Sequence, residues 1–230
     1  QDHGITLNSG QAVTRIDRKR RVVVTADGSK TPYDRLLIAT GSNPFILPVP
    51  GNDLEGVVTF RDIADVDAMI EAAAHFTRAV VIGGGLLGLE AASGLLQRGM
   101  KVTVVHLMDS LMERQLDTAA GHLLKRSLRE RSLEFEMPAE TKAILGDSRV
   151  TGVLLADGRT IAADLVVMAA GIKPNTELAK AAGLYCERGV VVSDTMQTYD
   201  PSIYAVGECV QHRGLTYGLV APLFEQAKVC

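Results

Sequence analysis

The chain of 230 residues lacks tryptophan altogether, and aromatic residues make up only 4% of it. So few flat rings argue against a surface on which sugars or bases stack. An excess of one charge is also missing, because 24 basic and 27 acidic residues give a net charge of −3. A chain this close to neutral fits poorly with a nucleic acid or a membrane surface as partner. We expect neither.

Cysteine is scarce and widely spaced. Cys186, Cys209 and Cys230 form no C-x-x-C pair, so the sequence predicts neither a disulfide framework nor a redox-active dithiol. A reducing cytoplasm is the expected location. The five histidines share no metal-ligand spacing, and no metal site is expected.

Long hydrophobic runs are missing too. The longest are the length of a strand, so no segment is expected to span a bilayer. The first residues, QDHGITLNSG, show no signal-peptide pattern. The composition, 47% hydrophobic, fits one large globular domain or two small ones.

Glycine, by contrast, is abundant, and its most informative cluster lies at 83–88. An apolar run, 80–82, stops at Gly83, and helical spacing begins two residues after Gly84; Gly83, Gly85 and Gly88 fit G-x-G-x-x-G. The first glycine permits a tight turn, the second lets a pyrophosphate approach the backbone, and the third lets the helix pack on its strand. Because a strand precedes the motif and a helix and a strand at 101–106 follow it, a dinucleotide site is predicted. The alternative is a glycine-rich turn without a ligand.

The apolar spacing around this motif predicts the elements of an α/β fold. Strands expected at 79–83, 101–105 and 133–136 alternate with helices reaching to about 98 and over about 116–131, which is typical of a doubly wound parallel sheet with right-handed crossovers. A helix is also expected over 62–76, with Asp62 or Asp65 as its cap.

The flanking segments predict shorter elements. Residues 4–40 have the pattern of β-strands with a hairpin turn at Asp27-Gly28, and 43–51 of a linker. The basic run 18–21 is interpreted as a solvated turn rather than an anion site. Further expectations are a hairpin over 149–161, a strand at 164–171, a turn at 172–175, a short helix at 176–182, strands at 189–192 and 202–208, and a helix from about 219.

Three predicted strands end in small residues: ATG at 39–41, AAG at 169–171 and AVGE at 205–208. Ligands of open α/β sheets bind at this edge, although each ending alone fits an ordinary strand end. The chain resembles the FAD-dependent pyridine nucleotide oxidoreductases. The stretches that carry the resemblance are DRLLIATGSNP (34–44), VVIGGGLLGLEAA (80–92), LVVMAAGIKPN (165–175) and SIYAVGEC (202–209). Within that family, 104–117 and 204–229 are most similar to large subunits of assimilatory NAD(P)H-dependent nitrite reductases.

The resemblance implies an architecture and an activity. A Rossmann-like NAD(P)-binding domain, 45–172, is inserted in a split, N-terminally truncated FAD-binding domain, 1–44 and 173–230, of β-β-α sandwich type. Hydride passes from NAD(P)H to FAD, and electrons then leave one at a time. The implied recipients are sirohaem and iron–sulfur modules of a longer subunit, or a separate acceptor protein. Two alternative functions stay open: a ferredoxin- or rubredoxin-reductase-like protein, and a nucleotide-binding scaffold without turnover. A homodimer also stays open.

The resemblance also implies site residues. Those expected at NAD(P) are Gly83, Gly84, Gly85, Leu86, Leu87, Gly88, Glu90, His106 and Gly171. Those expected at FAD are Ala39, Thr40, Gly41, Gly207 and Glu208, the last standing where relatives usually have Asp. No residue is expected to act as a catalytic acid or base, since the cofactors carry the chemistry. Glu90, a candidate contact of the nicotinamide, fits equally well as an ordinary helix-surface residue.

Two features of the chain bear on the cofactors. His106 stands where an acid would hold a ribose hydroxyl; it could donate to the 2′-hydroxyl, partly offset a 2′-phosphate when protonated, or be a neutral surface residue. Arg114 is the nearest cation downstream and fits a solvated helix start. We expect NADH as the coenzyme, with NADPH left open.

The chain also begins after the strand and glycine motif that open the family's FAD domain, so weak FAD binding or none is expected of this chain alone.

Overall fold

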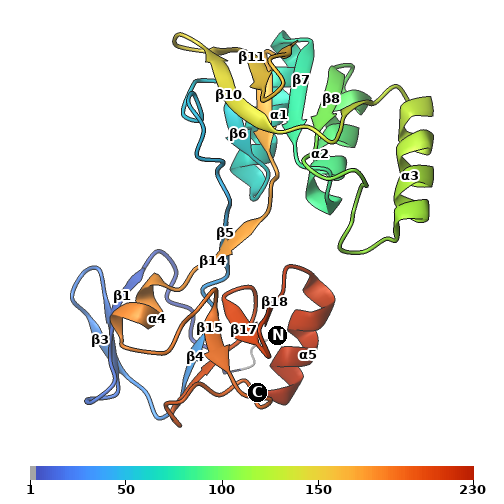
Figure 1. Cartoon of the computed structure of the whole chain (residues 1–230). Coiled ribbons are helices and arrows are strands. Elements are labelled where there is room, and N and C mark those ends of the chain that lie inside the picture. The colour runs from blue at the N-terminus through green and yellow to red at the C-terminus, as the bar shows by residue number, and fades with distance from the viewer. Residues whose placement is uncertain (1–3) are drawn as a thin grey trace. The chain divides into compact units, whose positions relative to one another are not determined.

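The computed structural model describes residues 4–230, so the first three residues of the predicted FAD-binding segment lie outside it. These residues form two compact units (Figure 1): unit 1 comprises 4–43 and 173–230, and unit 2 comprises 44–172. The chain crosses between them at β5 (Ser42–Pro44) and β14 (Ile172–Pro174), which pair as a two-stranded sheet. The expected linker at 43–51 therefore begins in a strand, and the expected turn at 172–175 is mostly a strand.

Unit 2 is built on a five-stranded sheet in the order β6-β13-β7-β8-β9, and every neighbouring pair is parallel. The predicted parallel sheet is confirmed, and it gains β6, which the sequence did not predict. Its elements are β6 (Val57–Thr59), α1 (Ile63–His75), β7 (Arg78–Ile82), α2 (Leu86–Gln97), β8 (Lys101–Val105), α3 (Thr118–Glu130), β9 (Glu134–Glu136) and β13 (Leu165–Met168).

The two faces of this sheet have different covers. On β7, Ala79 and Val81 join a cluster with residues of α1 and α2, and residues of α3 pack against it. Val80 and Ile82 point the other way, into a cluster with residues of β10 (Thr141–Gly146) and β11 (Val150–Leu155). These two strands and β12 (Thr160–Ala162) form an antiparallel sheet. The expectation of a doubly wound sheet is therefore wrong, because a β-meander replaces the helices on the second face.

Helix α1 begins with a reciprocal cap. Asp62 accepts a hydrogen bond from the backbone N–H of Asp65 over 3.0 Å, and Asp65 accepts one from the N–H of Asp62 over 3.3 Å. This is a capping box with aspartate in the position usually held by glutamate. The prediction of a cap is confirmed, with Asp62 as the N-cap residue.

Unit 1 combines two stretches of the chain around one core. Strand β4 pairs in parallel with β16, and β15 pairs in parallel with β17. The strand predicted to end in ATG at 39–41 is only three residues long, and β17 was not predicted. The elements are β1 (Val13–Asp17), β2 (Val22–Thr25), β3 (Lys30–Pro32), β4 (Leu36–Ile38), α4 (Glu177–Ala181), β15 (Val190–Val192), β16 (Ile203–Ala205), β17 (Val210–His212), β18 (Leu215–Thr216) and α5 (Val220–Val229).

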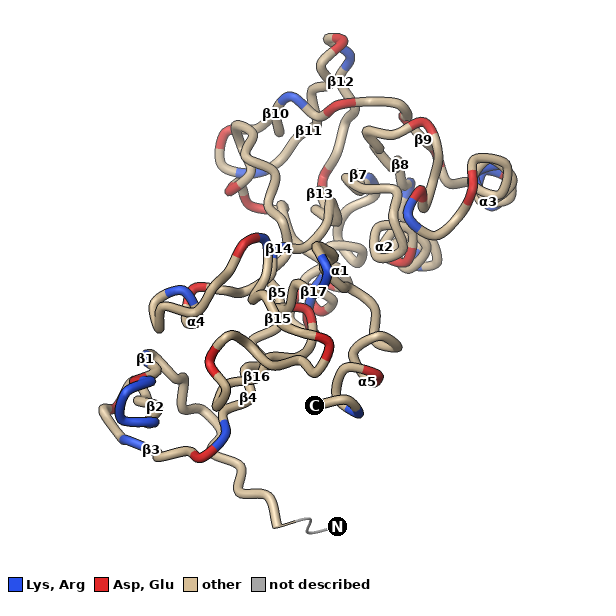
Figure 2. Tube along the Cα trace, turned by 60° about the horizontal axis from the view of Figure 1, so that its bottom comes forward, with Lys and Arg blue, Asp and Glu red and all other residues tan. Residues whose placement is uncertain are grey.

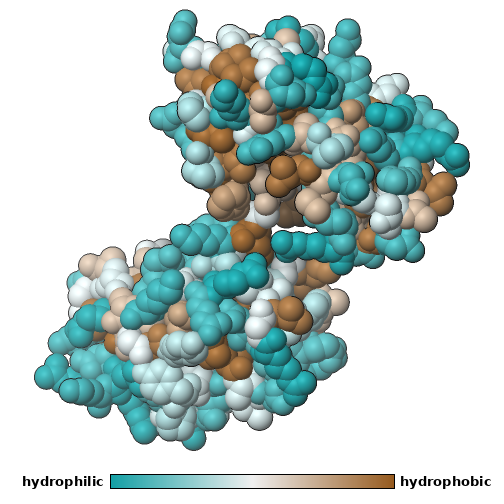
Figure 3. All heavy atoms as spheres, in the orientation of Figure 1, coloured by the Kyte–Doolittle hydropathy of each residue, from teal (hydrophilic) through white to brown (hydrophobic). Residues whose placement is uncertain are grey.

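Charge is interspersed along the described chain. Basic and acidic residues are both distributed over the two units (Figure 2), and hydrophilic side chains cover much of the face drawn in Figure 3, with apolar residues between them. Among residues 4–230, no helix is long and apolar enough to cross a bilayer. Within the same range, no group of histidine, cysteine and acidic side chains is placed to hold a metal ion. The three cysteines are free thiols.

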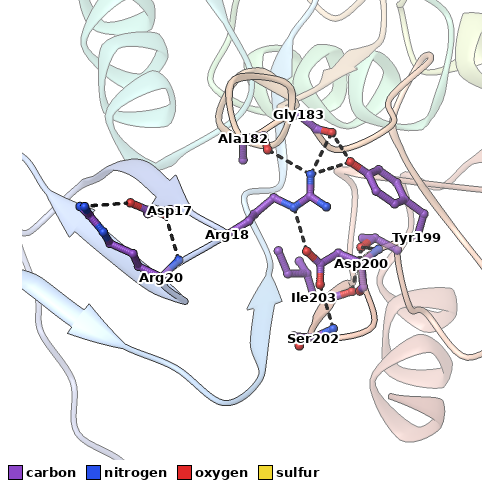
Figure 4. Close-up of polar contacts among 10 residues, drawn as sticks. Asp17, Arg18, Arg20, Ala182, Gly183, Tyr199, Asp200, Ser202 and Ile203 are labelled. Atoms are coloured by element: carbon purple, nitrogen blue, oxygen red, sulfur yellow. Dashed lines mark hydrogen bonds and ion pairs between the residues drawn. The ribbon is translucent and has the colours of Figure 1, made fainter.

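One residue of the basic run 18–21 departs from its predicted solvated state. Arg18 forms an ion pair with Asp200 over 2.8 Å, and its guanidinium lies 4.7 Å from the centre of the Tyr199 ring (Figure 4). It also donates to the backbone carbonyls of Ala182 and Gly183. The hydrogen bond to Asp200 raises the pKa of Arg18. Arg18 therefore joins the end of β1 to two segments of the C-terminal half of unit 1.

Candidate functional site

The glycine loop connects β7 to α2 at the carboxyl edge of the parallel sheet. Gly83 has a φ of +128°, and a Cβ added there would lie 2.3 Å from the carbonyl oxygen of Ala169. A Cβ at Gly88 would lie 2.0 Å from the carbonyl oxygen of Gly83. Both neighbouring atoms belong to the backbone and cannot move away to make room for a side chain, so packing requires glycine at both positions.

Gly85 differs from these two. It is the N-cap residue of α2, with ordinary extended dihedrals and no side-chain cap. A Cβ added to it would meet nothing within 4 Å. The first turn of α2 contains no acidic residue. Since the first N–H groups of a helix have no partner within the helix, they and the positive end of the helix dipole are suited to an anion at this position. This arrangement fits a bound pyrophosphate.

His106 lies beneath the loop. It follows β8 directly and is 8% exposed. The backbone N–H of Gly84 donates to its Nδ1 over 3.0 Å, and its Nε2 lies 3.2 Å from Oε2 of Glu113. Both ring nitrogens are thus engaged within the protein, and the surface alternative is excluded by burial. Its predicted role at the coenzyme ribose stays a prediction.

Glu90 borders a pocket that the sequence did not reveal. The cavity has a volume of about 440 Å³ and lies where β6 leads into α1, beside α2. Leu86 and Leu87 are partly exposed in the first turn of α2. No sequence signal predicted that the connection between β6 and α1 would contribute to a pocket. The lining residues are Phe60, Arg61, Asp62, Ile63, Val66, Leu87 and Glu90.

The AAG ending of β13 lies against the glycine loop. The N–H of Ala169 donates to the carbonyl of Ile82 over 2.9 Å. Gly171 has a φ of +124°, and a Cβ there would meet nothing within 4 Å. The backbone of Ala169 and Ala170 lies against Gly83, whereas Gly171 accepts a hydrogen bond from Phe45 next to the crossing into unit 1.

The predicted FAD residues gather at one edge of unit 1. The parallel pairing of β4 with β16 brings the two strand endings together, and the N–H of Val206 donates to the carbonyl of Ile38 over 3.0 Å. Thr40 donates its hydroxyl to the carbonyl of Asn175 over 2.8 Å. Gly41 and Gly207 both have positive φ, +64° and +90°. Ala39 is exposed at this edge.

Two residues that sequence reasoning missed support this edge. Ser42, which is buried, donates its hydroxyl to Oε2 of Glu208 over 2.9 Å. Gln226 on α5 accepts the N–H of Gly207 over 2.8 Å. Its side-chain Nε2 is buried and has no hydrogen-bond partner among the described residues. A buried donor without a partner, in a side chain bonded to Gly207, fits an acceptor atom supplied by a ligand. Neither serine nor glutamine at these positions carries a motif that marks it in advance.

Comparison with known proteins identifies the family of the chain. A family model for pyridine nucleotide-disulphide oxidoreductases matches residues 1–228. An NAD(P)H nitrite reductase of Bacillus subtilis is 53% identical over 229 residues, which are 100% of this chain and 28% of that protein. The assimilatory nitrate reductase electron transfer subunit of the same organism is 50% identical over 226 residues, 98% of this chain and 29% of that protein. The chain thus spans less than a third of these curated relatives.

A solved structure extends the comparison. Putidaredoxin reductase, in a covalent complex with putidaredoxin, matches with a TM-score of 0.90 and 33% identity over 96% of this chain and 56% of that chain. The chain is homologous to nitrite reductase large subunits and to ferredoxin reductases, and its mixed α/β fold matches theirs. Membership of this family implies NAD(P)H and FAD as cofactors. The predicted family is confirmed: the chain belongs to the pyridine nucleotide-disulphide oxidoreductases.

Proposed function

We propose that unit 2 binds NAD(P)H through the loop 83–88. The observation that carries this proposal is the contrast among three glycines. Packing within the chain requires glycine at Gly83 and Gly88, whereas Gly85 opens onto free space at the uncapped start of α2. Folding of the chain does not require this space, but the approach of a pyrophosphate to the backbone requires it.

In the same proposal, FAD binds at the edge of unit 1 formed by the ends of β4 and β16. Glu208, oriented by Ser42, would hold the ribityl hydroxyls, and the amide of Gln226 would donate to a flavin oxygen. Thr40 and Gly41 would lie against the ring system. The flavin, when bound, supplies an acceptor that takes up a hydride and releases electrons singly. The protein's part is to bind and orient.

The proposal extends to the longer protein in which such a chain occurs. We infer that electrons pass on for reduction of nitrite to ammonia in nitrate assimilation, which the 53% identity to a nitrite reductase supports. A reductase that serves a small iron–sulfur protein is the second candidate, supported by the match to putidaredoxin reductase. The domain assignment, NAD(P) for 45–172 and FAD for 1–44 with 173–230, belongs to this proposal.

Two measurements on the purified chain test the proposal. Titration calorimetry with NADH is expected to show one binding site, and NADH-dependent ferricyanide reduction is expected only after FAD is added. Absence of NADH binding would contradict the glycine-loop assignment. NADH binding without ferricyanide reduction at saturating FAD would favour a nucleotide-binding role without turnover. In the longer protein, nitrite consumption against reduction of an iron–sulfur protein separates the two electron-transfer candidates.

A further inference from the structure

We propose that Glu113, held by His106, is the residue that receives the adenosine ribose hydroxyls of the coenzyme and makes the site selective for NADH. This inference rests on the proposed binding of NAD(P)H at the glycine loop. It assigns the ribose contact to the segment after β8 rather than to residue 106 at the end of that strand.

His106 has no nitrogen left for a ribose. Because the N–H of Gly84 donates to Nδ1, that nitrogen carries no proton, and the ring proton lies on Nε2, facing Glu113 over 3.2 Å. A Cβ on Gly84 would lie 2.7 Å from two carbons of the imidazole. The ring is therefore packed under the loop, where it supports the backbone of Gly84 and orients Glu113.

Glu113 is placed by the backbone as well. The N–H of Met112 donates to the carbonyl of Gly84 over 3.0 Å, and Met112 has a positive φ of +52°. Leu111 is fully buried, and a Cβ on Gly121 of α3 would lie 2.1 Å from Oγ of Ser110. The turn that carries Glu113 is thus attached to the glycine loop on one side and to α3 on the other.

The chemistry of Glu113 suits a ribose. Its side chain is 35% exposed, against 10% for that of His106. One carboxylate oxygen accepts from His106, and no hydrogen bond to the other is found among residues 4–230. A carboxylate accepts several hydrogen bonds, so it can take those of the 2′- and 3′-hydroxyls. It would repel the 2′-phosphate of NADPH.

Two other charged residues lie in the same segment and provide controls. Asp109 and Arg114 are exposed, and within residues 4–230 neither forms a hydrogen bond or an ion pair with His106 or the glycine loop. If the negative charge of this segment alone determined the coenzyme preference, replacing Asp109 would change the affinities as much as replacing Glu113. If a cation determined it, Arg114 would favour NADPH.

The test is calorimetric titration of NADH and NADPH into the purified chain and its variants. The wild-type chain is expected to bind NADH more tightly than NADPH. Glu113→Gln, which removes one charge without changing size, is expected to weaken NADH binding about tenfold and to narrow the NADH-to-NADPH affinity ratio. Asp109→Asn is expected to leave both affinities within about twofold.

Three outcomes would overturn the inference. They are an unchanged affinity ratio in Glu113→Gln, an equal change in Asp109→Asn, and a wild-type preference for NADPH that Arg114→Gln abolishes. As a positioning residue, His106 gives a further readout: His106→Gln should shift the ratio in the same direction as Glu113→Gln, and an unchanged ratio would contradict its role. A wild-type chain that binds neither coenzyme would instead contradict the proposed function.

Discussion

Ser42 donates its hydroxyl to Glu208 over 2.9 Å, although the two residues lie 166 positions apart in the chain. Ser42 lies on β5, the strand on which the chain leaves unit 1. Glu208 follows β16, in the second chain segment of the same unit. The bond therefore joins the two chain segments of unit 1 at its candidate cofactor edge. It orients the acid proposed to hold the flavin side chain, and it also contributes to the stability of the unit.

Ser42→Ala is expected to lower the free energy of unfolding of unit 1 by about 1–2 kcal/mol, because it removes a donor to a half-buried acid. Tyrosine fluorescence during urea denaturation measures this unit specifically. The chain has no tryptophan, and all five tyrosines, Tyr33, Tyr185, Tyr199, Tyr204 and Tyr217, lie in unit 1.

Ser29→Ala is the matched control for that variant. Ser29 also donates to a carboxylate, that of Asp27, over 3.0 Å, but within an exposed hairpin turn. Its loss is expected to cost less than about 0.5 kcal/mol. Equal losses for Ser42→Ala and Ser29→Ala would show that the bond to Glu208 contributes no more than a surface contact.

The glycine loop predicts opposite effects for two substitutions. Gly85→Ala is expected to weaken NADH binding at least about tenfold while changing stability by less than about 1 kcal/mol, because its methyl group enters open space. Gly88→Ala is expected to destabilise unit 2 by about 3 kcal/mol, because its methyl group meets the carbonyl of Gly83. Calorimetry measures the affinity, and hydrogen–deuterium exchange of α2 measures the stability.

Gly94→Ala on the exposed face of α2 is the control for both. A Cβ there would meet nothing within 4 Å, so NADH affinity should be unchanged. The helix should gain about 0.5–1 kcal/mol, since alanine is the better helix former. A loss of affinity in Gly94→Ala equal to that in Gly85→Ala would indicate that any methyl on α2 disturbs binding, and the phosphate assignment would fail.

The parts of the fold that the sequence predicted depend on local signals. The run at 80–82 followed by Gly83 marks a strand, a turn and a helix within ten residues, and the structure has all three. Asp62 with Asp65 marks the start of α1 in the same way. Periodicity of apolar residues and capping chemistry act between neighbours, so a single sequence shows them.

The parts that the sequence missed depend on distant contacts. Strand β6 is three residues long and is stabilised by its pairing with β13 more than 100 positions away. The antiparallel strands β10 and β11 cover the second sheet face by packing against Val80 and Ile82 of β7, which lie far earlier in the chain. Likewise, Ser42 and Gln226 have no motif, and the inward orientation of His106 follows from Gly84, which lies 22 residues before it. Patterns of neighbouring residues contain no information on such pairs.

Asp194 is expected to titrate well below an ordinary aspartate. Hydrogen bonds from Arg213 and then from His212 lower its pKa from 3.8 to about 2. Since the folded-state pKa is the lower one, the stabilising contribution of Asp194 is present above about pH 4 and is lost as the pH falls towards 2. Carbon-detected NMR titration of the carboxyl group checks the value. In Arg213→Gln the pKa should rise towards 3.8, whereas a carboxyl titrating near 3.8 in the wild type would contradict the contact.

Arg18 provides the last test, because its contacts differ so much from those of its neighbour Arg20. Arg18 pairs with Asp200 over 2.8 Å with both side chains mostly shielded, whereas Arg20 reaches Asp17 over 3.9 Å from an exposed position (Figure 4). Arg18→Gln is therefore expected to lower the free energy of unfolding of unit 1 by about 2 kcal/mol, since it leaves Asp200 without its cation. Arg20→Gln should cost less than about 0.5 kcal/mol. The urea midpoint of tyrosine fluorescence measures both losses of stability. Similar midpoints for the two variants would contradict the structural role of Arg18 and favour the solvated turn that the sequence predicted.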